Sequence, residues 1–177
     1  MVSISRWTLN DIWHYGRVNI DEWTETYNIP FYFYYTGQWP DMGWTVRNNN
    51  SNIVGYIIGQ AKTDKPEEAK GHVTAVTICE EYRRIGIATL LMNMLERVSD
   101  VLYKAQFVDL YVRMNNFSAQ TLYKKMGYIL YRQIINYYET IHEDGFDMRK
   151  SMPRDTVKKF MIPIPHPVSR DELDWQP

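Results

Sequence analysis

The stretch that most constrains the fold is residues 76–91, where a strand-like run passes through a basic turn into an amphipathic helix. The residues up to Cys79 are β-branched or apolar, as in a buried strand, and Arg83 and Arg84 follow in the turn. The apolar positions beyond the turn recur at helical spacing, namely Ala88, Leu91, Met92, Leu95, Val98 and Leu102. A strand that leads directly into such a helix predicts a sheet with helices packed against it.

Further strands and helices are predicted on both sides of this unit. Thr8 and Asp11 are spaced as in a capping box, with Asp in place of Glu, and open a helix that runs to about Arg17. Pro30 is placed to start a second helix, which ends at about Gln38. The strands are predicted at residues 2–7, 44–47, 53–62, 71–79, 107–113, 128–138 and 146–150, with one more helix at residues 119–126.

The order of these elements is β-α-α-β-β-β-α-β-α-β-β, which predicts one α/β domain over residues 1–150 with a mixed sheet and flanking helices. Residues 151–177 form a segment rich in proline and charge. Within it, residues 162–167 read Ile-Pro-Ile-Pro-His-Pro, which is incompatible with a helix or a central strand. We therefore expect an extended C-terminal tail that packs on the domain or on a partner subunit.

Composition and charge exclude several classes of function. The formal net charge of −1 argues against a general nucleic-acid-binding surface. Cys79 is the only cysteine, which excludes an internal disulfide and a zinc site of several thiolates, and the four histidines lack metal-ligand spacing. The sequence shows neither a signal-peptide pattern nor an apolar run of bilayer length. We expect a cytoplasmic protein with no bound metal, no membrane attachment and no direct nucleic-acid contact.

The turn at Arg83-x-x-Gly86-x-Ala88 has the features of an anion-binding cradle. The first N–H groups of a helix and its dipole attract negative charge, and small residues let an anion approach the backbone closely. Arg83 and Arg84 can add charge-assisted hydrogen bonds. The same residues also fit an ordinary helix start with solvated arginines, and the short glycine pattern alone leaves both interpretations open.

Two motifs together resemble the GNAT acetyltransferase family. The cradle resembles the Q/R-x-x-G-x-G/A element with which that family binds the pyrophosphate of coenzyme A. One strand and one helix later, Asn116-x-x-Ala119-x-x-Leu122-Tyr123-x-x-x-Gly127-Tyr128 resembles its second signature. The resemblance implies a GNAT fold of about seven mostly antiparallel strands in a mixed sheet, about four flanking helices, and central strands that splay apart.

The resemblance implies acetyl-coenzyme A as cosubstrate, without a metal. The residues implied to bind it are Val76, Ile78, Arg83, Arg84, Gly86, Ile87, Ala88, Thr89, Asn116 and Tyr123. A backbone N–H near Val76 would polarise the thioester carbonyl, and Tyr123 would protonate the leaving thiolate. By its position alone, Tyr123 also fits the apolar stripe of its helix as an ordinary core residue.

The acceptor amine can be narrowed by the cost of deprotonating it. At neutral pH this cost is about 1 kcal/mol for a chain-terminal α-amine, and roughly 4–5 kcal/mol for a lysine side chain. A lysine acetyltransferase therefore gains more from a dedicated base. The strand at residues 71–78 contains no carboxylate, and its polar side chains on one face are His72 and Thr74. This favours an α-amine.

A closer resemblance is to the catalytic subunits of the NatB N-terminal acetyltransferase, and it extends nearly from end to end. It is carried by residues 24–32, 71–75, 107–113, 147–150, 154–156 and 162–168. It implies acetylation of an initiator methionine that is followed by Asp, Glu, Asn or Gln. It also implies a large helical auxiliary subunit, which brings the enzyme to nascent chains at the ribosome. The segment Phe31-Tyr-Phe-Tyr-Tyr35 and the tail are candidate docking surfaces for that subunit.

The four accepted second residues share a side-chain oxygen, so their recognition requires hydrogen-bond donors. Tyr27, His72 and Thr74 can supply them. The resemblance places Glu25 and the pair Tyr137-Tyr138 beside the peptide groove, and Glu25 and His72 are candidates for relaying the amine proton. An apolar pocket for the methionine is expected at Ile29 and Phe31. Taken alone, His72 fits a structural histidine, Glu25 a loop cap, and the tyrosine pair ordinary strand aromatics.

Two rival functions remain open at this point. One is a GNAT acetyltransferase with another substrate, such as other N-termini, lysine side chains or small amines. The other is a scaffold that binds the coenzyme without catalysis.

Overall fold

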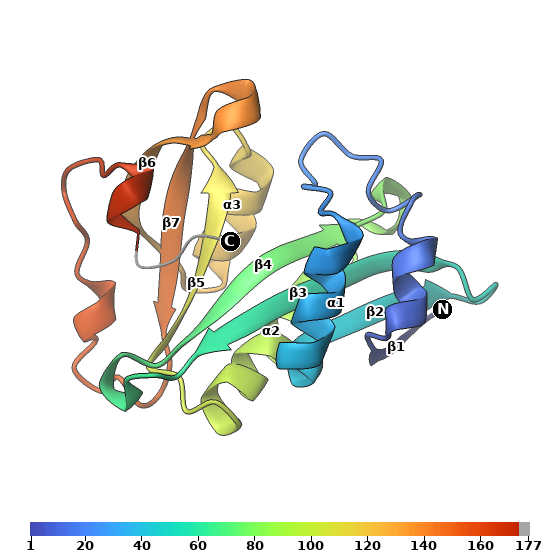
Figure 1. Cartoon of the computed structure of the whole chain (residues 1–177), viewed down its shortest axis with the longest axis horizontal. Helices are drawn as coiled ribbons and strands as arrows, with labels where there is room; N and C mark the ends of the chain where they lie inside the picture. Colours follow the sequence, from blue (N-terminus) through green and yellow to red (C-terminus); the bar gives the residue numbers. More distant parts are fainter. Residues whose placement is uncertain (174–177) are drawn as a thin grey trace.

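The part of the chain that the structure describes, residues 1–173, contains a seven-stranded sheet in the order β1-β2-β3-β4-β5-β7-β6 (Figure 1). The strands are β1 (Val2–Arg6), β2 (Gly43–Asn48), β3 (Ile53–Lys62), β4 (Lys70–Ile78), β5 (Phe107–Arg113), β6 (Ile129–Tyr138) and β7 (Glu143–Ser151). Neighbouring strands are antiparallel except for β4 and β5, which run parallel. This computed structural model confirms the predicted mixed, mostly antiparallel sheet.

Helices cover both faces of the sheet. They are α1 (Ile29–Gln38), α2 (Ile87–Val101), α3 (Phe117–Lys125) and the 3-10 helix η1 (Leu9–His14), which together give the four predicted flanking helices. In Figure 1, α1 lies in front of the sheet, across β2 and β3, while α2 and α3 lie behind it. None of the helices within residues 1–173 is long and apolar enough to cross a lipid bilayer.

The apolar stripe of α2 anchors the core. Leu91, Met92 and Leu95 are completely buried, and Leu95 packs against β3 at Gly59, where an added Cβ would lie 2.5 Å from its Cδ1 atom. Burial of each such side chain stabilises the fold by about 1.5–3 kcal/mol. The helical spacing read from the sequence therefore identifies the centre of the buried face of α2 correctly, whereas Leu102, predicted at the end of the same stripe, follows the helix and is 53% exposed.

The first predicted helix is shorter than expected. Its capping box is present, with the Thr8 N–H donating to Asp11 Oδ2 at 2.8 Å, but the helix is of 3-10 type and ends at His14 instead of near Arg17. The chain turns at Tyr15, whose buried ring stacks on Tyr56 with centroids 4.3 Å apart. The packing of this aromatic ring therefore replaces the last predicted helical turn.

The aromatic residues of α1 divide between the core and the surface. Tyr32 and Tyr35 are buried, whereas Phe33 and Tyr34 are 47% and 58% exposed. The helix starts with Asn28, whose side chain accepts a hydrogen bond from the Phe31 N–H at 3.0 Å. Only part of the predicted docking segment is therefore available to a partner.

Strands β4 and β5 separate after a short paired stretch. Their register ends at Val73 opposite Leu110, and residues 74–78 have no partner in β5. On its other side β4 remains paired with β3, where Thr74 is the extra residue of a bulge between the pairs Ile58–Ala75 and Gly59–Val73. The bulge interrupts the alternation of side chains by which the sequence places His72 and Thr74 on one face of the strand. The separation of β4 from β5 opens a gap at the sheet centre.

The tail lies along the outer edge of β6. The Val168 N–H donates to Gln133 O at 2.9 Å, and Val168 O accepts from the Ile135 N–H at 2.9 Å, which forms a parallel bridge. Val168 and Leu173 form a small apolar cluster with Ile134. Residues 162–167 are neither helix nor strand, as their prolines require, and residues 174–177 lie outside the described residues.

Candidate active site

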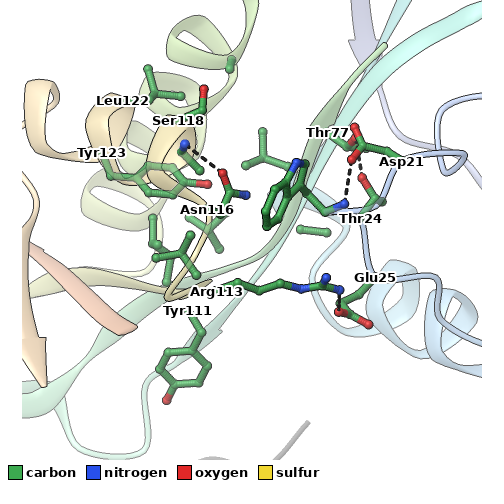
Figure 2. Close-up of a pocket in the computed structure, with 18 of the residues that line it drawn as sticks. Asp21, Thr24, Glu25, Thr77, Tyr111, Arg113, Asn116, Ser118, Leu122 and Tyr123 are labelled. Carbon is green, nitrogen blue, oxygen red and sulfur yellow. Dashed lines mark hydrogen bonds and ion pairs between the residues drawn. The ribbon is translucent and has the colours of Figure 1, made fainter. Parts of the chain in front are cut away.

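A cavity of about 1130 Å³ fills the space that opens between β4 and β5. Its walls come from β4, the start of α2, α3, the loop at residues 21–27 and the end of β6. Figure 2 shows Tyr123 and Asn116 on one side of this space and Thr24 and Glu25 on the other. All the residues predicted to bind the coenzyme, to relay protons or to contact the second residue of the peptide line the cavity, so segments far apart in the sequence converge here.

The predicted anion cradle forms one end of the cavity. Gly86 has φ +90°, a conformation that L side chains avoid, and an added Cβ there would meet no atom within 4 Å. The helix begins directly after it, so the N–H groups of Ile87, Ala88 and Thr89 lack partners within the helix. Open space in front of unpaired N–H groups fits a diphosphate, and Val76 and Ile78 line the cavity next to it.

The two arginines of the turn have different environments. Arg83 Nε donates to Ile78 O at 2.8 Å, and its guanidinium pairs with Asp21, so much of its bonding capacity ties the 21–27 loop to the turn. Arg84 is exposed and has φ +66°. Arg84 is thus the more available of the two for a phosphate, which the sequence did not distinguish.

Tyr123 projects from α3 into the cavity, although it also belongs to the apolar stripe. Its side chain is only 7% exposed, and burial raises the pKa of its hydroxyl to about 12. Among residues 1–173 no hydrogen bond to this hydroxyl is formed, and Figure 2 shows it pointing toward Asn116 and the open space. Asn116 itself caps α3 by accepting from the Ala119 N–H at 3.1 Å.

His72 belongs to a buried charged group on the face of β4 and β5. Its Nδ1 lies 2.7 Å from Asp109 Oδ1, and the other oxygen of Asp109 is 2.7 Å from Lys70 Nζ. Burial alone would raise the pKa of Asp109, but Lys70 and His72 hold it well below its usual range. The imidazole also contacts Tyr111, with ring centroids 5.0 Å apart.

Tyr27 and Thr74 lie next to each other in the cavity wall. The Tyr27 hydroxyl donates to Thr74 O at 3.4 Å, and Thr74 Oγ1 donates to the Tyr35 hydroxyl at 3.3 Å. Burial raises the pKa of Tyr27, so its hydroxyl stays protonated, and the long 3.4 Å contact to Thr74 O is the one that a substrate acceptor would replace. The three donors predicted for a side-chain oxygen, Tyr27, Thr74 and His72, all line this cavity.

Glu25, Tyr137 and Tyr138 line the cavity together, and we call these three residues its mouth. Glu25 Oε1 accepts from Arg113 Nη2 at 2.5 Å, and the Arg113 guanidinium lies 5.1 Å from the Tyr138 ring centroid. The ring of Tyr137 packs edge-on against the ring of Tyr111, with centroids 4.9 Å apart. Arg113 therefore links the two sides of the mouth, the 21–27 loop and the end of β6.

Comparison with known proteins agrees with this geometry. Residues 13–128 match the model of the acetyltransferase (GNAT) family. The N-terminal acetyltransferase B complex catalytic subunit NAA20 of Arabidopsis thaliana is 45% identical over 99% of each chain. The Dictyostelium discoideum protein N-alpha-acetyltransferase 20 is 42% identical over 98% of this chain and 99% of its own. The chain belongs to the GNAT family, among the NatB catalytic subunits.

Solved structures of the same group have the same fold. Naa20 of Chaetomium thermophilum, in complex with a bisubstrate analogue, superposes with a TM-score of 0.88 at 34% identity, over 96% of this chain and 97% of that one. A NatB complex bound to CoA and MES contains a chain with a TM-score of 0.77 and 34% identity, over 85% of this chain and 99% of that one. The splayed strands and cavity of this GNAT chain therefore belong to an acetyltransferase fold.

Several residues that line this acetyltransferase cavity, or hold the side chains that do, were not predicted from the sequence. Asp109, Arg113 and Asp21 hold His72, Glu25 and Arg83 in place. A second tie joins Thr24 Oγ1 and Thr77 Oγ1 at 2.9 Å. The available signal was Asp109, a carboxylate within the otherwise apolar run of residues 107–112.

One expectation about the substrate pocket finds no support in this GNAT cavity. Neither Ile29 nor Phe31 lines the cavity. Ile29 is 42% exposed, and the ring of Phe31 stacks on that of Tyr27 with their centroids 3.9 Å apart. Within residues 1–173, no group of three or more His, Cys, Asp or Glu side chains is arranged to hold a metal ion.

Proposed function

We propose that this chain transfers the acetyl group of acetyl-coenzyme A to the α-amine of an initiator methionine that is followed by Asp, Glu, Asn or Gln. The observation that carries the proposal is the continuity of the cavity. One space is lined both by the N–H groups after Gly86 and by the donors Tyr27, His72 and Thr74. A diphosphate-bearing coenzyme and a short polar side chain can thus be held at opposite ends of one cavity.

The coenzyme end of the cavity fits a long, anionic molecule. The N–H groups of Ile87, Ala88 and Thr89 and the side chain of Arg84 bind the diphosphate, and residues 74–78 of β4 offer backbone groups to the extended arm. Arg83 holds the turn in shape through Ile78 and Asp21. Acetyl-coenzyme A supplies the activated acyl group. A NatB complex bound to CoA supports this assignment.

The chemistry requires loss of an amine proton and protonation of a thiolate. An α-amine has a pKa near 7.7–8.0, so a weak acceptor such as His72 or Glu25, acting directly or through water, suffices to take its proton. A backbone N–H near Val76 stabilises the developing oxyanion. The Tyr123 hydroxyl, protonated below its raised pKa of about 12, donates a proton to the leaving sulfur.

The peptide end selects the second residue of the substrate. Tyr27, His72 and Thr74 donate to its side-chain oxygen, and a side chain without such an oxygen offers these donors no acceptor in addition to the partners they already have. Glu25, Tyr137 and Tyr138 narrow the mouth and admit a free chain end. A Naa20 structure in complex with a bisubstrate analogue supports a site that holds both substrates at once.

We also propose that the enzyme works in the cytoplasm with a large helical auxiliary subunit, which brings it to nascent N-termini at the ribosome, without direct contact with nucleic acid or membrane. Related chains occur in a solved NatB complex, which supports a partner subunit. The exposed rings of Phe33 and Tyr34 and the tail are the surfaces assigned to that contact. Residues 1–150 are the catalytic domain in this proposal.

A peptide panel tests the proposal. The purified chain, with and without the auxiliary subunit, is incubated with acetyl-coenzyme A and peptides that start Met-Asp, Met-Lys or Ser-Glu. We expect kcat/KM for Met-Asp to exceed the other two by at least about 100-fold, because buried donors discriminate strongly against side chains that do not pair with them. Equal rates on Met-Lys or on internal lysines would assign another substrate, and coenzyme binding without turnover would indicate a scaffold.

A further inference from the structure

The charged group around Asp109 is not needed to explain the fold. Asp109 is completely buried, and Lys70 and His72 are each 7% exposed. A buried ion pair contributes little net stability, because the loss of hydration offsets most of the attraction between the charges. Replacing a buried ion pair by apolar side chains of similar volume is often neutral or stabilising. The position of these three ionisable groups, with His72 in the cavity wall and Asp109 and Lys70 behind it, points to a role at the site.

The geometry fixes the orientation of the His72 ring. An ionised carboxylate only accepts hydrogen bonds, so the 2.7 Å contact between Asp109 Oδ1 and His72 Nδ1 requires the proton on Nδ1. Tyr111 packs against the ring from the side, at 5.0 Å between centroids. Nε2 lies on the opposite edge of the imidazole from Nδ1, and His72 lines the cavity.

We propose that Asp109, held by Lys70, is the positioning residue that fixes His72 in the Nδ1–H form and presents Nε2 to the substrate. Nε2 can then accept a proton in its neutral form or donate a hydrogen bond when protonated. Lys70 prevents Asp109 from turning away, because the 2.7 Å contact to Nζ occupies its second oxygen. The inference rests on the proposed function in that it deepens the role of His72 in N-terminal acetylation.

The substitution Asp109→Asn tests this arrangement. The Lys70 ammonium has only donors, so it retains the amide oxygen and turns the amide NH₂ toward His72 Nδ1, which must then accept. We expect kcat/KM for a Met-Asp peptide to fall about tenfold or more, the loss that accompanies one charge-assisted hydrogen bond. The Asp109→Leu/Lys70→Met variant removes both charges at once and guards against misfolding caused by an unpaired lysine.

A double-mutant cycle separates positioning from a purely structural role. If Asp109 acts through His72, Asp109→Asn lowers kcat/KM in the wild type but has little further effect in the His72→Ala background. Losses that multiply in the double variant would overturn the proposal, as would unchanged kcat/KM for Met-Asp in both Asp109 variants. Thermal unfolding of each variant shows that the compared proteins are folded.

Nitrogen-15 NMR of the imidazoles gives a readout that does not depend on activity. Near pH 9, where imidazoles are generally neutral, the His72 signal should report a proton on Nδ1 in the wild type and on Nε2 in Asp109→Asn. The chain has four histidines, and loss of one signal in His72→Ala assigns it. A wild-type ring protonated on Nε2 overturns the positioning role. If the wild-type ring carries its proton on Nδ1 as expected but the protein does not acetylate Met-Asp peptides, the proposed function is wrong and the positioning of His72 is not.

Discussion

At the scale of single residues, Tyr123 shows how one side chain can satisfy two demands. It belongs to the apolar stripe of α3 and is 7% exposed, as a core residue would be. Its hydroxyl nevertheless faces the cavity, and burial raises its pKa to about 12. A hydroxyl with this pKa remains protonated throughout the physiological range, so it can act as an acid there.

We predict that Tyr123→Phe lowers kcat by about 100-fold or more with little change in thermal stability, because it removes a general acid and leaves the ring in place. Steady-state kinetics with Met-Asp peptide, together with calorimetric binding of acetyl-coenzyme A, measure the effect. The affinity for acetyl-coenzyme A should be nearly unchanged.

Tyr128→Phe is the matched control for this substitution. Tyr128 is also buried, with its ring 5.9 Å from that of Tyr123, but its hydroxyl donates to Glu96 Oε1 at 2.9 Å. Removing it should lower stability by about 1 kcal/mol and leave kcat unchanged. A similar loss of kcat in both variants would indicate a general disturbance of α3 and remove the assignment of Tyr123 as the acid.

At the scale of elements, the turn from β4 into α2 depends on one backbone conformation. Gly86 has φ +90° and marks the N-terminus of α2. The space around its missing Cβ is open, so a larger residue there would clash with nothing. The cost of a substitution would come from the backbone alone.

We predict that Gly86→Ala costs about 1–2 kcal/mol of stability, because L residues are strained in this region of φ. If the turn relaxes to avoid this strain, the N–H groups of Ile87 and Ala88 change direction, and KM for acetyl-coenzyme A rises by about tenfold. Gly16→Ala is the control, since it also meets no atom within 4 Å and Gly16 has no positive φ. Equal KM values for the two variants would argue against the cradle.

Local patterns predicted most of the elements, and long-range contacts account for what they missed. The strands Ile53–Lys62 and Phe107–Arg113 follow the predicted bounds, because their residues are β-branched, apolar and bounded by turns. The bulge at Thr74 depends on β3, and the role of Asp109 depends on Lys70 and His72 in another strand. Such contacts between distant segments leave no periodic signal in the chain.

At the scale of the whole molecule, the tail completes the sheet next to the active site. Without it, β6 would be an open edge, and exposed edges invite pairing with other chains. Arg170 from the tail pairs with Glu139 at 2.9 Å and lies 5.7 Å from the Tyr137 ring centroid, at the cavity mouth. The tail therefore supports both the edge of the sheet and the mouth of the cavity.

We predict that Val168→Asp detaches the tail from β6. An unpaired carboxylate in the cluster of Ile134 and Leu173 would cost about 3–5 kcal/mol, so the tail leaves the sheet instead. Hydrogen exchange should then accelerate at the Ile135 N–H, which donates to Val168 O in the wild type. The KM for Met-Asp peptide should rise several-fold as Tyr137 loses support, while the KM for acetyl-coenzyme A should stay the same.

Val157→Asp places the same charge elsewhere in the tail, at a side chain that is 81% exposed. This substitution should change neither the hydrogen exchange of the Ile135 N–H nor the KM for Met-Asp peptide, because its carboxylate remains in water. If Val168→Asp accelerates exchange at Ile135 without affecting peptide KM, the tail protects only the sheet edge. A rise in KM confined to the peptide would instead mean that the far end of the chain shapes the substrate mouth, because the tail holds the outer side of Tyr137.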